Sequence, residues 1–508
     1  MTGGMSPSFV RESPSPFPVD LWSEAVYSRR AIPETLAAGA PAPGTADAAP
    51  EPLPRGPRVP LASPPLRLAP SPGSATFPAS LSGPPAFSGP PAFSGPAVPD
   101  FPAALSDPAV LAALLHYSYG LLQHDLTPGG WPLHRAVASA RCRYPSELTL
   151  VASPSAAYRF DPLHHQLVRL GDSSAGDQRG RGIGADGPGT DRPEADRPAA
   201  DRPEADRPAA DDPGASRYVV ITSRFARTAR LYGDYAPRLC AQEAGMLLGA
   251  VHLVATALGL RTRPGQDRET LLALCANWLP ATAEHPMGYL EIPPAAGHPA
   301  AHPKEHAAER SAERAWPPPE LASVLRARHS GAAVFDPEPA PAPRALLTDL
   351  DAALTAAPFT DFTCHLLVQR VAGTAPGHYV HGGGRLRQAG GAADPLALLE
   401  QIGQTEGRVS LNFRSTACVA YIAVRRATAV ARYGADAFRR LHLTAGAAAH
   451  LLCVAAARHG LAARVHNGYD AAVAERLLGL ASGEETVLFQ VALGTARPGA
   501  AFRVPVVF

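Results

Sequence analysis

Two stretches of the chain, LYGDYAPRLCAQEAGMLLGAVHLVATALGL (231–260) and RYGADAFRRLHLTAGAAAHLLCVAAARHGL (432–461), decide which fold to expect. They align with each other without a gap. Each is preceded by an apolar run, YVVIT or ACVAYIAV, that is typical of a buried strand. The sequence therefore predicts an internal duplication. The residues that match between the two copies are Tyr232, Gly233, Ala236, Arg238, Ala244, Gly245, Gly259 and Leu260 in the first, and Tyr433, Gly434, Ala437, Arg439, Ala445, Gly446, Gly460 and Leu461 in the second.

Both copies continue into a long helix that is apolar on nearly all faces and rich in alanine and glycine. Such a helix belongs at the centre of a domain or between two packed copies, because small residues let backbones approach closely. We expect α+β domains that pack on each other through these helices.

Length and composition set the limits of the fold. A chain of 508 residues exceeds what one hydrophobic core usually organises, so two domains are expected. With 56 prolines, 45 glycines and only 6% aromatic residues, long stretches cannot bury enough apolar surface to fold. The net charge of +1, without a basic stripe, argues against a nucleic-acid partner.

The sequence shows no membrane segment and no metal-binding pattern. The N-terminal sequence has no basic start followed by an apolar core, and the longest apolar run, MLLGAVHLVATALGL, is too short to span a bilayer. We expect a soluble cytoplasmic protein with no membrane partner. The six cysteines form no CxxC pair, so we expect no metal site and no redox dithiol.

Composition shifts along the chain predict four parts, with two tandem domains between Pro-rich tracts. The first part is expected to be mostly disordered, apart from a short ordered piece around VDLWSEAVYSRRAI. The histidines of the linker are interrupted by prolines and read as solvated. The expected bounds are 1–105 for the Pro/Ala-rich N-terminal region, 106–293 for the first domain with a disordered insertion at about 171–216, 294–344 for the Pro/His-rich linker, and 345–508 for the second domain.

Three motifs then carry a family resemblance. RAVASARCRYPSELTLVA (135–152), followed by AAYRFDPLHHQLVRL (156–170), is similar to the small-residue loop and strands of SagB-type azoline dehydrogenases, which have the FMN-dependent nitroreductase fold. The "KYG … YR … LEAGH … LGL" helix entry of that family resembles both repeats. The C-terminal stretch 468–494 resembles the family's last helix and strand. The resemblance covers most of residues 110–293 and 345–508.

The resemblance implies an α+β fold of two tandem nitroreductase-like domains forming a pseudo-dimer, with FMN at the interface of the copies. One FMN per chain is expected, because the second half shows no recognisable counterpart of the Ser139 loop. Each cofactor candidate also has an ordinary structural interpretation, as a loop, a buried carboxylate or a surface arginine. The residues that the motifs point to are Arg135, Ala138, Ser139, Ala140, Glu243, Asn467, Gly468 and Arg503.

For catalysis, the family uses a Lys-Tyr pair, and this chain departs from it. Leu231 and Tyr232 stand at that place in the first half, and Arg432 and Tyr433 in the second. Leucine cannot exchange a proton and arginine stays protonated, so Tyr232 or Tyr433 is the better candidate base. Arg432 belongs to the candidate catalytic set by position. Which half is active stays open, and either tyrosine can instead simply pack before the helix.

The activity implied by the resemblance is FMN-dependent oxidation of thiazolines or oxazolines to azoles in a ribosomally made peptide, as in thiopeptide-type pathways. The implied partners are the precursor peptide and the cyclodehydratase components of the pathway. Two alternatives remain open. The missing lysine fits a catalytically degenerate scaffold in a peptide-modifying complex, and the fold also fits a general NAD(P)H-dependent nitroreductase.

Overall fold

The computed structural model describes the chain in several ranges, which leave out most of the Pro-rich tracts. The piece expected to be ordered around 19–32 and the insertion at about 171–216, up to residue 215, lie outside the described residues, as do the linker histidines. The described residues are 56–65, 68, 105, 107–126, 132–153, 155–170, 216–279, 284–294, 316–331, 335–389, 394–405, 408–409, 411–480, 484–498 and 503–506.

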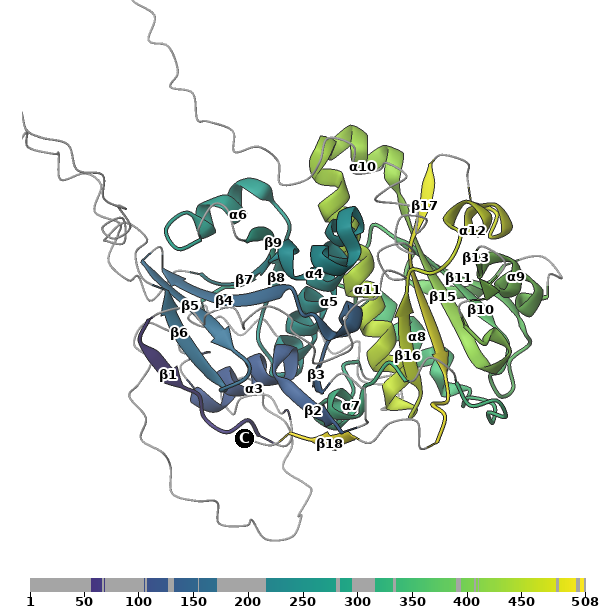
Figure 1. The fold of residues 1–508 in the computed structure, drawn as a ribbon, viewed down its shortest axis with the longest axis horizontal. Helices are drawn as coiled ribbons and strands as arrows, with labels where there is room; N and C mark the ends of the chain where they lie inside the picture. Colours follow the sequence, from purple (N-terminus) through teal and green to yellow (C-terminus); the bar gives the residue numbers. More distant parts are fainter. Residues whose placement is uncertain are drawn as a thin grey trace, which may run out of the picture.

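The first half folds around an antiparallel sheet that lies on a helix layer (Figure 1). Its strands alternate with turns where the sequence has Gly, Pro or Asp, and its central strands are buried on both faces. The strand order is β1 (Arg58–Pro60), β6 (Gln166–Leu170), β5 (Ala156–Asp161), β4 (Ser146–Ser153), β7 (Arg217–Ser223), β9 (His285–Ile292) and β8 (Arg263–Gly265). The helices of this half are α3 (Pro108–Tyr119), α4 (Phe225–Tyr232), α5 (Ala236–Ala257) and α6 (Arg268–Cys275).

The second half repeats this plan. Six of its strands follow the order of the first sheet without its β1, as β12 (Arg385–Gln388), β11 (Gly377–Gly382), β10 (Thr363–Val368), β15 (Thr416–Arg425), β17 (Glu485–Gly494) and β16 (Ala462–His466). A separate short pair is formed by β13 (Gln404–Thr405) and β14 (Arg408–Val409). The helices are α8 (Ala345–Thr355), α9 (Pro395–Ile402), α10 (Arg426–Tyr433), α11 (Ala437–Arg458) and α12 (Ala471–Leu477). The predicted duplication is thus visible in the structure as two sheets of the same topology.

The repeated Tyr-Gly sequence makes a sharp kink before each central helix. Gly233 has φ 49° and ψ −132°, and Gly434 has φ 55° and ψ −132°. This region of backbone conformation is open to glycine and strained for residues with a Cβ. The kink turns α4 away from α5 and α10 away from α11, which explains why both copies keep the Tyr-Gly pair.

The two central helices pack against each other, as the sequence predicts, and lie between the two sheets (Figure 1). Their contact is reciprocal. A Cβ on Gly245 would lie 2.2 Å from the carbonyl oxygen of Leu443, and a Cβ on Gly446 would lie 2.1 Å from that of Gln242. Gly245 and Gly446 are 201 positions apart, and so are Gln242 and Leu443. The two helices therefore use equivalent surfaces for this contact, as in an interface with two-fold symmetry.

Matched arginines extend this symmetry to the sheets. Arg238 donates to the carbonyl oxygen of Leu488 in the second half at 2.8 Å. Its counterpart Arg439 donates to the carbonyl oxygen of Met287 in the first half. Met287 and Leu488 are again 201 positions apart. Each half therefore satisfies a buried carbonyl of the other with a guanidinium, and one apolar cluster runs through both halves.

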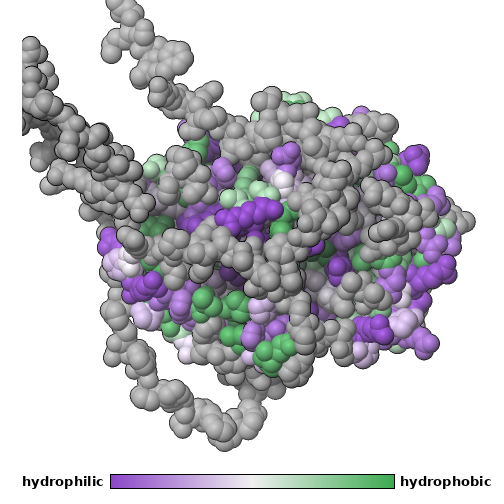
Figure 2. Space-filling model, viewed as in Figure 1, coloured by the Kyte–Doolittle hydropathy of each residue, from purple (hydrophilic) through white to green (hydrophobic). Residues whose placement is uncertain are grey.

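The central helices are also the only described segments long and apolar enough to cross a membrane. The spans Phe225–Ala257 and Arg426–Arg458 meet the length and hydropathy of a membrane helix. However, 83% and 94% of the apolar windows are buried inside the protein, as in the core helices of a soluble fold. On the face shown in Figure 2, hydrophobic and hydrophilic residues of the described part alternate in small patches, as on an ordinary water-facing surface.

Three segments have structure that the expected bounds do not describe. Within residues 1–105, Gly56–Pro65 is ordered and carries β1 on the edge of the first sheet. Within the expected linker 294–344, α7 (Leu321–Ala327) packs against α11 through buried leucines. Near the C-terminus, β18 (Arg503–Pro505) crosses to the first half, where it forms a small sheet with β2 (Leu121–Asp125) and β3 (Leu133–Arg135). These pieces lack strong apolar periodicity and are ordered by tertiary pairing.

Candidate functional site

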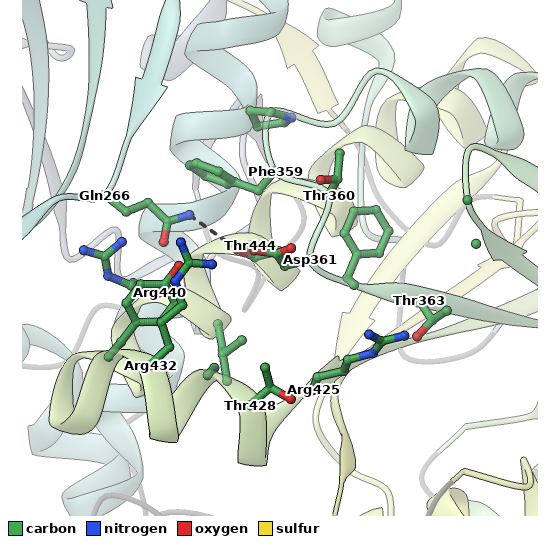
Figure 3. A pocket seen from close by; sticks show the side chains of 17 residues that line it. Gln266, Phe359, Thr360, Asp361, Thr363, Arg425, Thr428, Arg432, Arg440 and Thr444 are labelled. Carbon is green, nitrogen blue, oxygen red and sulfur yellow. Dashed lines mark hydrogen bonds between the residues drawn. The ribbon is translucent and has the colours of Figure 1, made fainter.

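A cavity of about 620 Å³ opens where the kink between α10 and α11 faces the segment that leads into β10. This volume is in the range of small-molecule and cofactor sites. One lining residue, Gln266, comes from the first half, so the cavity lies between the halves (Figure 3). The lining residues are Gln266, Pro358, Phe359, Thr360, Asp361, Phe362, Thr363, Gly382, Gly383, Arg425, Thr428, Ala429, Arg432, Tyr433, Arg440, Leu441 and Thr444.

The cavity wall combines positive charge with apolar surface. Three arginines, Arg425, Arg432 and Arg440, and one carboxylate residue, Asp361, line the cavity. Phe359 and Leu441 contribute apolar faces. The amide of Gln266 donates to the hydroxyl of Thr444 at 3.4 Å, and Figure 3 shows this bond joining the halves across the cavity. The wall is therefore suited to a flat, partly apolar ligand that carries an anionic group.

Tyr433, one of the candidate bases, lies on this wall between two arginines. The guanidinium carbon of Arg440 is 4.4 Å from the centre of the Tyr433 ring, and that of Arg432 is 5.1 Å away. Arg440 is itself fixed by a 2.7 Å hydrogen bond from its Nε to Asp436. The cation–π contacts hold the ring at the cavity, with Arg432 adding a permanent positive charge.

The corresponding place in the first half holds a network of ion pairs. Arg159 binds Glu284 through two hydrogen bonds of 2.9 Å, and Arg224 contacts the same carboxylate at 2.7 Å. Arg227 contacts Glu147 at 2.6 Å. Burial alone would raise the pKa of Glu284, but the charges and hydrogen bonds of Arg159 and Arg224 outweigh it and lower the pKa to about 2.

The strand register identifies the counterparts of these residues. Glu147 pairs with Thr222 and Thr363 pairs with Ala423, and Thr222 and Ala423 are 201 positions apart. Thr363 is therefore the counterpart of Glu147. By their places after the repeated strands, Arg425 and Thr428 correspond to Arg224 and Arg227. Threonine thus stands in the second half where the first half has two members of its ion-pair network, and this difference leaves the space open.

The loop expected to meet the cofactor in the first half is held against α5. The hydroxyl of Ser139 is hydrogen-bonded to Glu243, and Tyr119 and the amide of Ser146 also donate to that carboxylate, at 3.2 and 3.4 Å. Burial raises the pKa of Glu243, and the hydrogen bonds from Ser139 and Ser146 offset this only in part. The structure therefore brings Ser139 and Glu243 together, but as a closed polar cluster.

The neighbours of Ser139 share this packing. Ala138 is buried, and Ala140 begins a short 3-10 turn. The guanidinium of Arg135 stacks on the rings of Tyr119 and Tyr144, at 4.3 and 4.5 Å from their centres. Arg135 is thus placed beside the Ser139 loop by two aromatic rings.

The second-half candidates for the same expected site lie on two different segments. Asn467 donates to Gln242 at 2.7 Å, one residue from Glu243 on α5. The amide of Gly468 donates to the ring of His466 at 3.0 Å. Arg503 lies on β18 and is bound to Asp125 at 3.1 Å. Asn467 thus approaches the predicted cofactor residues, whereas Arg503 serves the cross-half strand.

Tyr232 sits at the first kink, and like Tyr433 it is half-buried. It is not among the residues that line the cavity, whereas Arg432 and Tyr433 are. Sequence reasoning missed Gln266, Arg440 and residues 358–363. The segment 358–363 leads into β10 as residues 142–147 lead into β4, because Thr363 corresponds to Glu147. Its sequence, PFTDFT, has no small-residue signature by which it could have been found.

One part of the cavity wall, Arg425 to Thr444, lies in a segment of the chain that matches a known family. Residues 391–495 match the family model described as the nitroreductase family. The second half contains a nitroreductase-family domain. This region includes α10, α11 and their kink, hence Arg432 and Tyr433, together with β15, β16 and β17. The match does not extend to the first half.

Solved structures extend the likeness in fold. A putative nitroreductase from Anabaena variabilis is 17% identical, with a TM-score of 0.55, over 77% of this chain and 88% of that one. Since 77% exceeds either half alone, the shared fold covers parts of both halves. The Escherichia coli microcin synthetase McbBCD complex with truncated pro-MccB17 bound is 14% identical, covering 34% of this chain and 62% of that chain, with a TM-score of 0.24. No curated protein matches the chain.

A third structure, of the FMN- and NADPH-dependent nitroreductase NfnB from a Sphingopyxis strain, is 17% identical over 35% of this chain and 89% of that chain, with a TM-score of 0.22. Within the described residues, no group of three or more His, Cys, Asp or Glu side chains could hold a metal ion. All six cysteines lie in the described part of the chain and are free thiols.

Proposed function

We propose that this protein is an FMN-dependent oxidoreductase that oxidises azoline rings of a ribosomally made peptide to azoles, with its active site in the cavity of the second half. The observation that carries the proposal is the position of Arg432 and Tyr433. They stand where the similar dehydrogenases have their Lys-Tyr pair, and they line the cavity beside a wall contributed by the other half. The first half is then a second nitroreductase-like domain whose own site is closed.

The cavity fits the chemistry of FMN. A phosphate dianion requires cationic donors, and Arg432 and Arg440 supply guanidinium groups on one side of the cavity, with Arg425 on the other side (Figure 3). The flavin ring requires apolar faces and polar edges, which Phe359, Leu441, Gln266 and Thr444 provide. Bound FMN would supply the two-electron acceptor for the hydride that leaves the azoline ring.

The residues of the chain would then handle the proton. Azoline oxidation removes a proton from Cα and a hydride from the adjacent ring carbon, so a base must reach Cα. Tyr433 is the group that we propose for this role, because Arg432 and Arg440 stay protonated; the carboxylate of Asp361 is a second proton acceptor on the cavity wall. Their positive charge would stabilise the negative charge that develops as the Cα proton leaves.

The first test is the visible spectrum of the purified full chain, followed by release of the chromophore and its mass. The proposal expects bound FMN. A colourless protein that cannot be reconstituted with FMN would favour the alternative of a degenerate scaffold. Steady oxidation of NADPH with a quinone acceptor, without azoline turnover, would favour a general nitroreductase.

The second test compares the two tyrosines. A synthetic peptide with one thiazoline is incubated with wild type, Tyr433→Phe and Tyr232→Phe, and loss of two hydrogens is followed by mass spectrometry. Tyr433→Phe is expected to slow azole formation by about 10² to 10⁴-fold with FMN retained, since it removes a general base. Tyr232→Phe is the matched control and should keep activity. The reverse pattern would place the active site in the first half.

The proposed setting follows from the substrate class. A precursor peptide must be cyclised before its azolines can be oxidised, so cyclodehydratase components are the proposed partners and the cytoplasm the proposed location. A thiopeptide-type product remains part of this proposal.

A further inference from the structure

The first sheet shows how an extended segment docks on this fold. Strand β1 adds to the outer edge of β6, antiparallel, with Arg58 opposite Val168 and Pro60 opposite Gln166. The amide of Arg169 donates to the carbonyl of Pro57 at 2.9 Å, and that of Leu61 donates to the carbonyl of His165 at 3.3 Å. A short Pro-flanked segment that precedes the first domain is thus bound through main-chain hydrogen bonds to a sheet edge.

The second sheet offers the same edge on β12. Arg159 opposes Val168 on the first sheet, and Val380 opposes Arg387 on the second. Arg159 and Val380 have partners at corresponding positions of β4 and β10, so these two residues correspond to each other. It follows that Arg387 corresponds to Val168, and that Gln388 corresponds to Arg169, whose amide donates a hydrogen bond to Pro57, next to β1. Within the described residues, no strand pairs with the outer edge of β12.

The backbone groups at this edge can be assigned. The amide of Ala389 donates to His378 on β11, so alternate residues of β12 bond inward and those between them face outward. The N–H and C=O groups of Leu386 and Gln388 therefore point to the outer edge. These are the positions that correspond to Leu167 and Arg169, which face β1. An edge of this kind is a template for an added strand.

The edge also leads to the cavity. Gly382, the last residue of β11, and Gly383, in the turn between β11 and β12, line the cavity. A strand bound antiparallel to β12, as β1 is to β6, would run from Gln388 towards Arg385 and leave the edge at this turn. Its C-terminal continuation would then enter the cavity.

The positive charge on the edge of β12 favours an acidic peptide as the added strand. Arg385 and Arg387 are exposed and lie on one face of β12, since they are two residues apart. The cavity adds the arginines at positions 425, 432 and 440. Cross-strand pairs of opposite charge stabilise strand pairing, so acidic side chains at alternate positions fit this edge.

We propose that the edge of β12 is the docking site of the peptide substrate. An extended segment with acidic residues at alternate positions adds as an antiparallel strand to β12, and the residues that follow it enter the cavity. This inference rests on the proposed function for its substrate class, and it extends that function by naming where the peptide binds and in which direction.

The test measures binding to the full chain by fluorescence anisotropy, with a labelled ten-residue peptide of alternating Glu and Val as the probe. Gln388→Pro removes an outward N–H at an exposed edge position, where proline is tolerated. It is expected to weaken binding by about fivefold to tenfold, the effect of about one main-chain hydrogen bond. Gln388→Ala keeps the N–H and is the matched control.

The charge contribution is tested separately. Arg385→Glu with Arg387→Glu should abolish binding of the Glu-Val probe, whereas Arg385→Lys with Arg387→Lys should retain it. A probe with Lys in place of Glu should not bind wild type. Binding that is the same in the proline, glutamate and wild-type chains would overturn the proposal. Residues 191–213 contain eight Asp and Glu but only four Arg. Binding that becomes measurable only after deletion of these residues would assign the edge to this segment of the chain itself, and would also overturn the proposal.

The docking site and the proposed reaction can be contradicted independently of each other. If the probe binds in a manner that depends on Gln388 but the chain holds no flavin, the docking site stands and the proposed reaction fails. If a thiazoline peptide carrying the acidic segment is oxidised equally well by wild type and Gln388→Pro at limiting peptide concentration, the reaction stands and the docking site fails.

Discussion

At the scale of single residues, the molecule contrasts two buried carboxylates. Glu243 has hydrogen bonds from neutral donors, and burial raises its pKa. Glu284 has two guanidinium partners, and its pKa is lowered to about 2. The environment of each carboxylate, rather than its depth, decides the sign, because a full positive charge offsets desolvation and a hydroxyl does not.

Glu284 leads to a prediction about acid stability. A carboxylate whose pKa is lowered on folding adds stability that is present above its unfolded pKa of about 4.5 and is lost as the pH falls towards the folded value. Glu284→Gln should therefore lose on the order of 3 kcal/mol of unfolding free energy at pH 7 and much less at pH 3. Urea unfolding at both pH values measures this. Glu485→Gln, at the counterpart position, is the control, and an equal loss at both pH values would contradict the prediction.

Cys142 gives a second prediction at this scale. It is half-buried, whereas the other five cysteines are at most 3% exposed. Burial raises the pKa of the Cys142 thiol above its usual value, with a hydrogen bond to Tyr144 acting in the opposite direction. Iodoacetamide should label Cys142 alone under native conditions, slowly at pH 7 and faster as the pH approaches 9 and above, because the thiolate is the nucleophile. Peptide mapping checks this, and labelling at several cysteines in the folded chain would refute it.

At the scale of the elements, the fold depends on the crossing of α5 and α11. Gly245 and Gly446 each face a backbone carbonyl of the other helix, which cannot move without moving the helix. The small-residue pattern of the repeats therefore sets the distance between the two halves, and with it the width of any site at their interface.

The crossing predicts a graded effect of added methyl groups. Gly245→Ala and Gly446→Ala place a Cβ about 2 Å from a carbonyl oxygen and should each cost about 1 to 3 kcal/mol or more through overpacking. Gly249→Ala places its Cβ 3.0 Å from the carbonyl oxygen of Ala447 and should cost less. Thermal unfolding followed by circular dichroism ranks the three. The interpretation fails if Gly249→Ala is the most destabilising.

At the scale of the whole molecule, the two halves have diverged around the same architecture. The first half fills the place of the cavity with ion pairs, and the second leaves it open with threonines at positions 363 and 428. The proposed flavin stoichiometry is therefore one per chain, in the second half, with the first half contributing Gln266 to the wall.

This asymmetry can be tested by transferring the closing residues. Thr363→Glu with Thr428→Arg introduces the pair that Glu147 and Arg227 form in the first half, next to Arg425. The variant should fold but lose at least tenfold in FMN affinity, measured by fluorescence quenching of added FMN, since an ion pair would occupy the site. Thr363→Ser with Thr428→Ser is the control and should bind as wild type. Full FMN binding by the Glu/Arg variant would place the flavin elsewhere.

The sequence by itself determined the features that depend on neighbouring residues. The duplication, the two long small-residue helices and the Tyr-Gly kinks follow from apolar periodicity and from the backbone freedom of glycine, which are local properties. The Arg-Tyr pair at the second kink was a candidate on the same basis. The packing of the two helices was predictable because a helix apolar on all faces has to be covered on all faces.

Only the tertiary structure decided which half holds the cavity. That outcome depends on whether Glu147, Arg159, Arg227 and Glu284, from four separate elements, meet in one network, and no local pattern encodes their meeting. The segment 358–363 and the strands β1 and β18 were missed for the same reason. The two strands are held by main-chain pairing with β6 and β2, far away in the chain, so their structure is a property of the assembled fold and not of their own sequence.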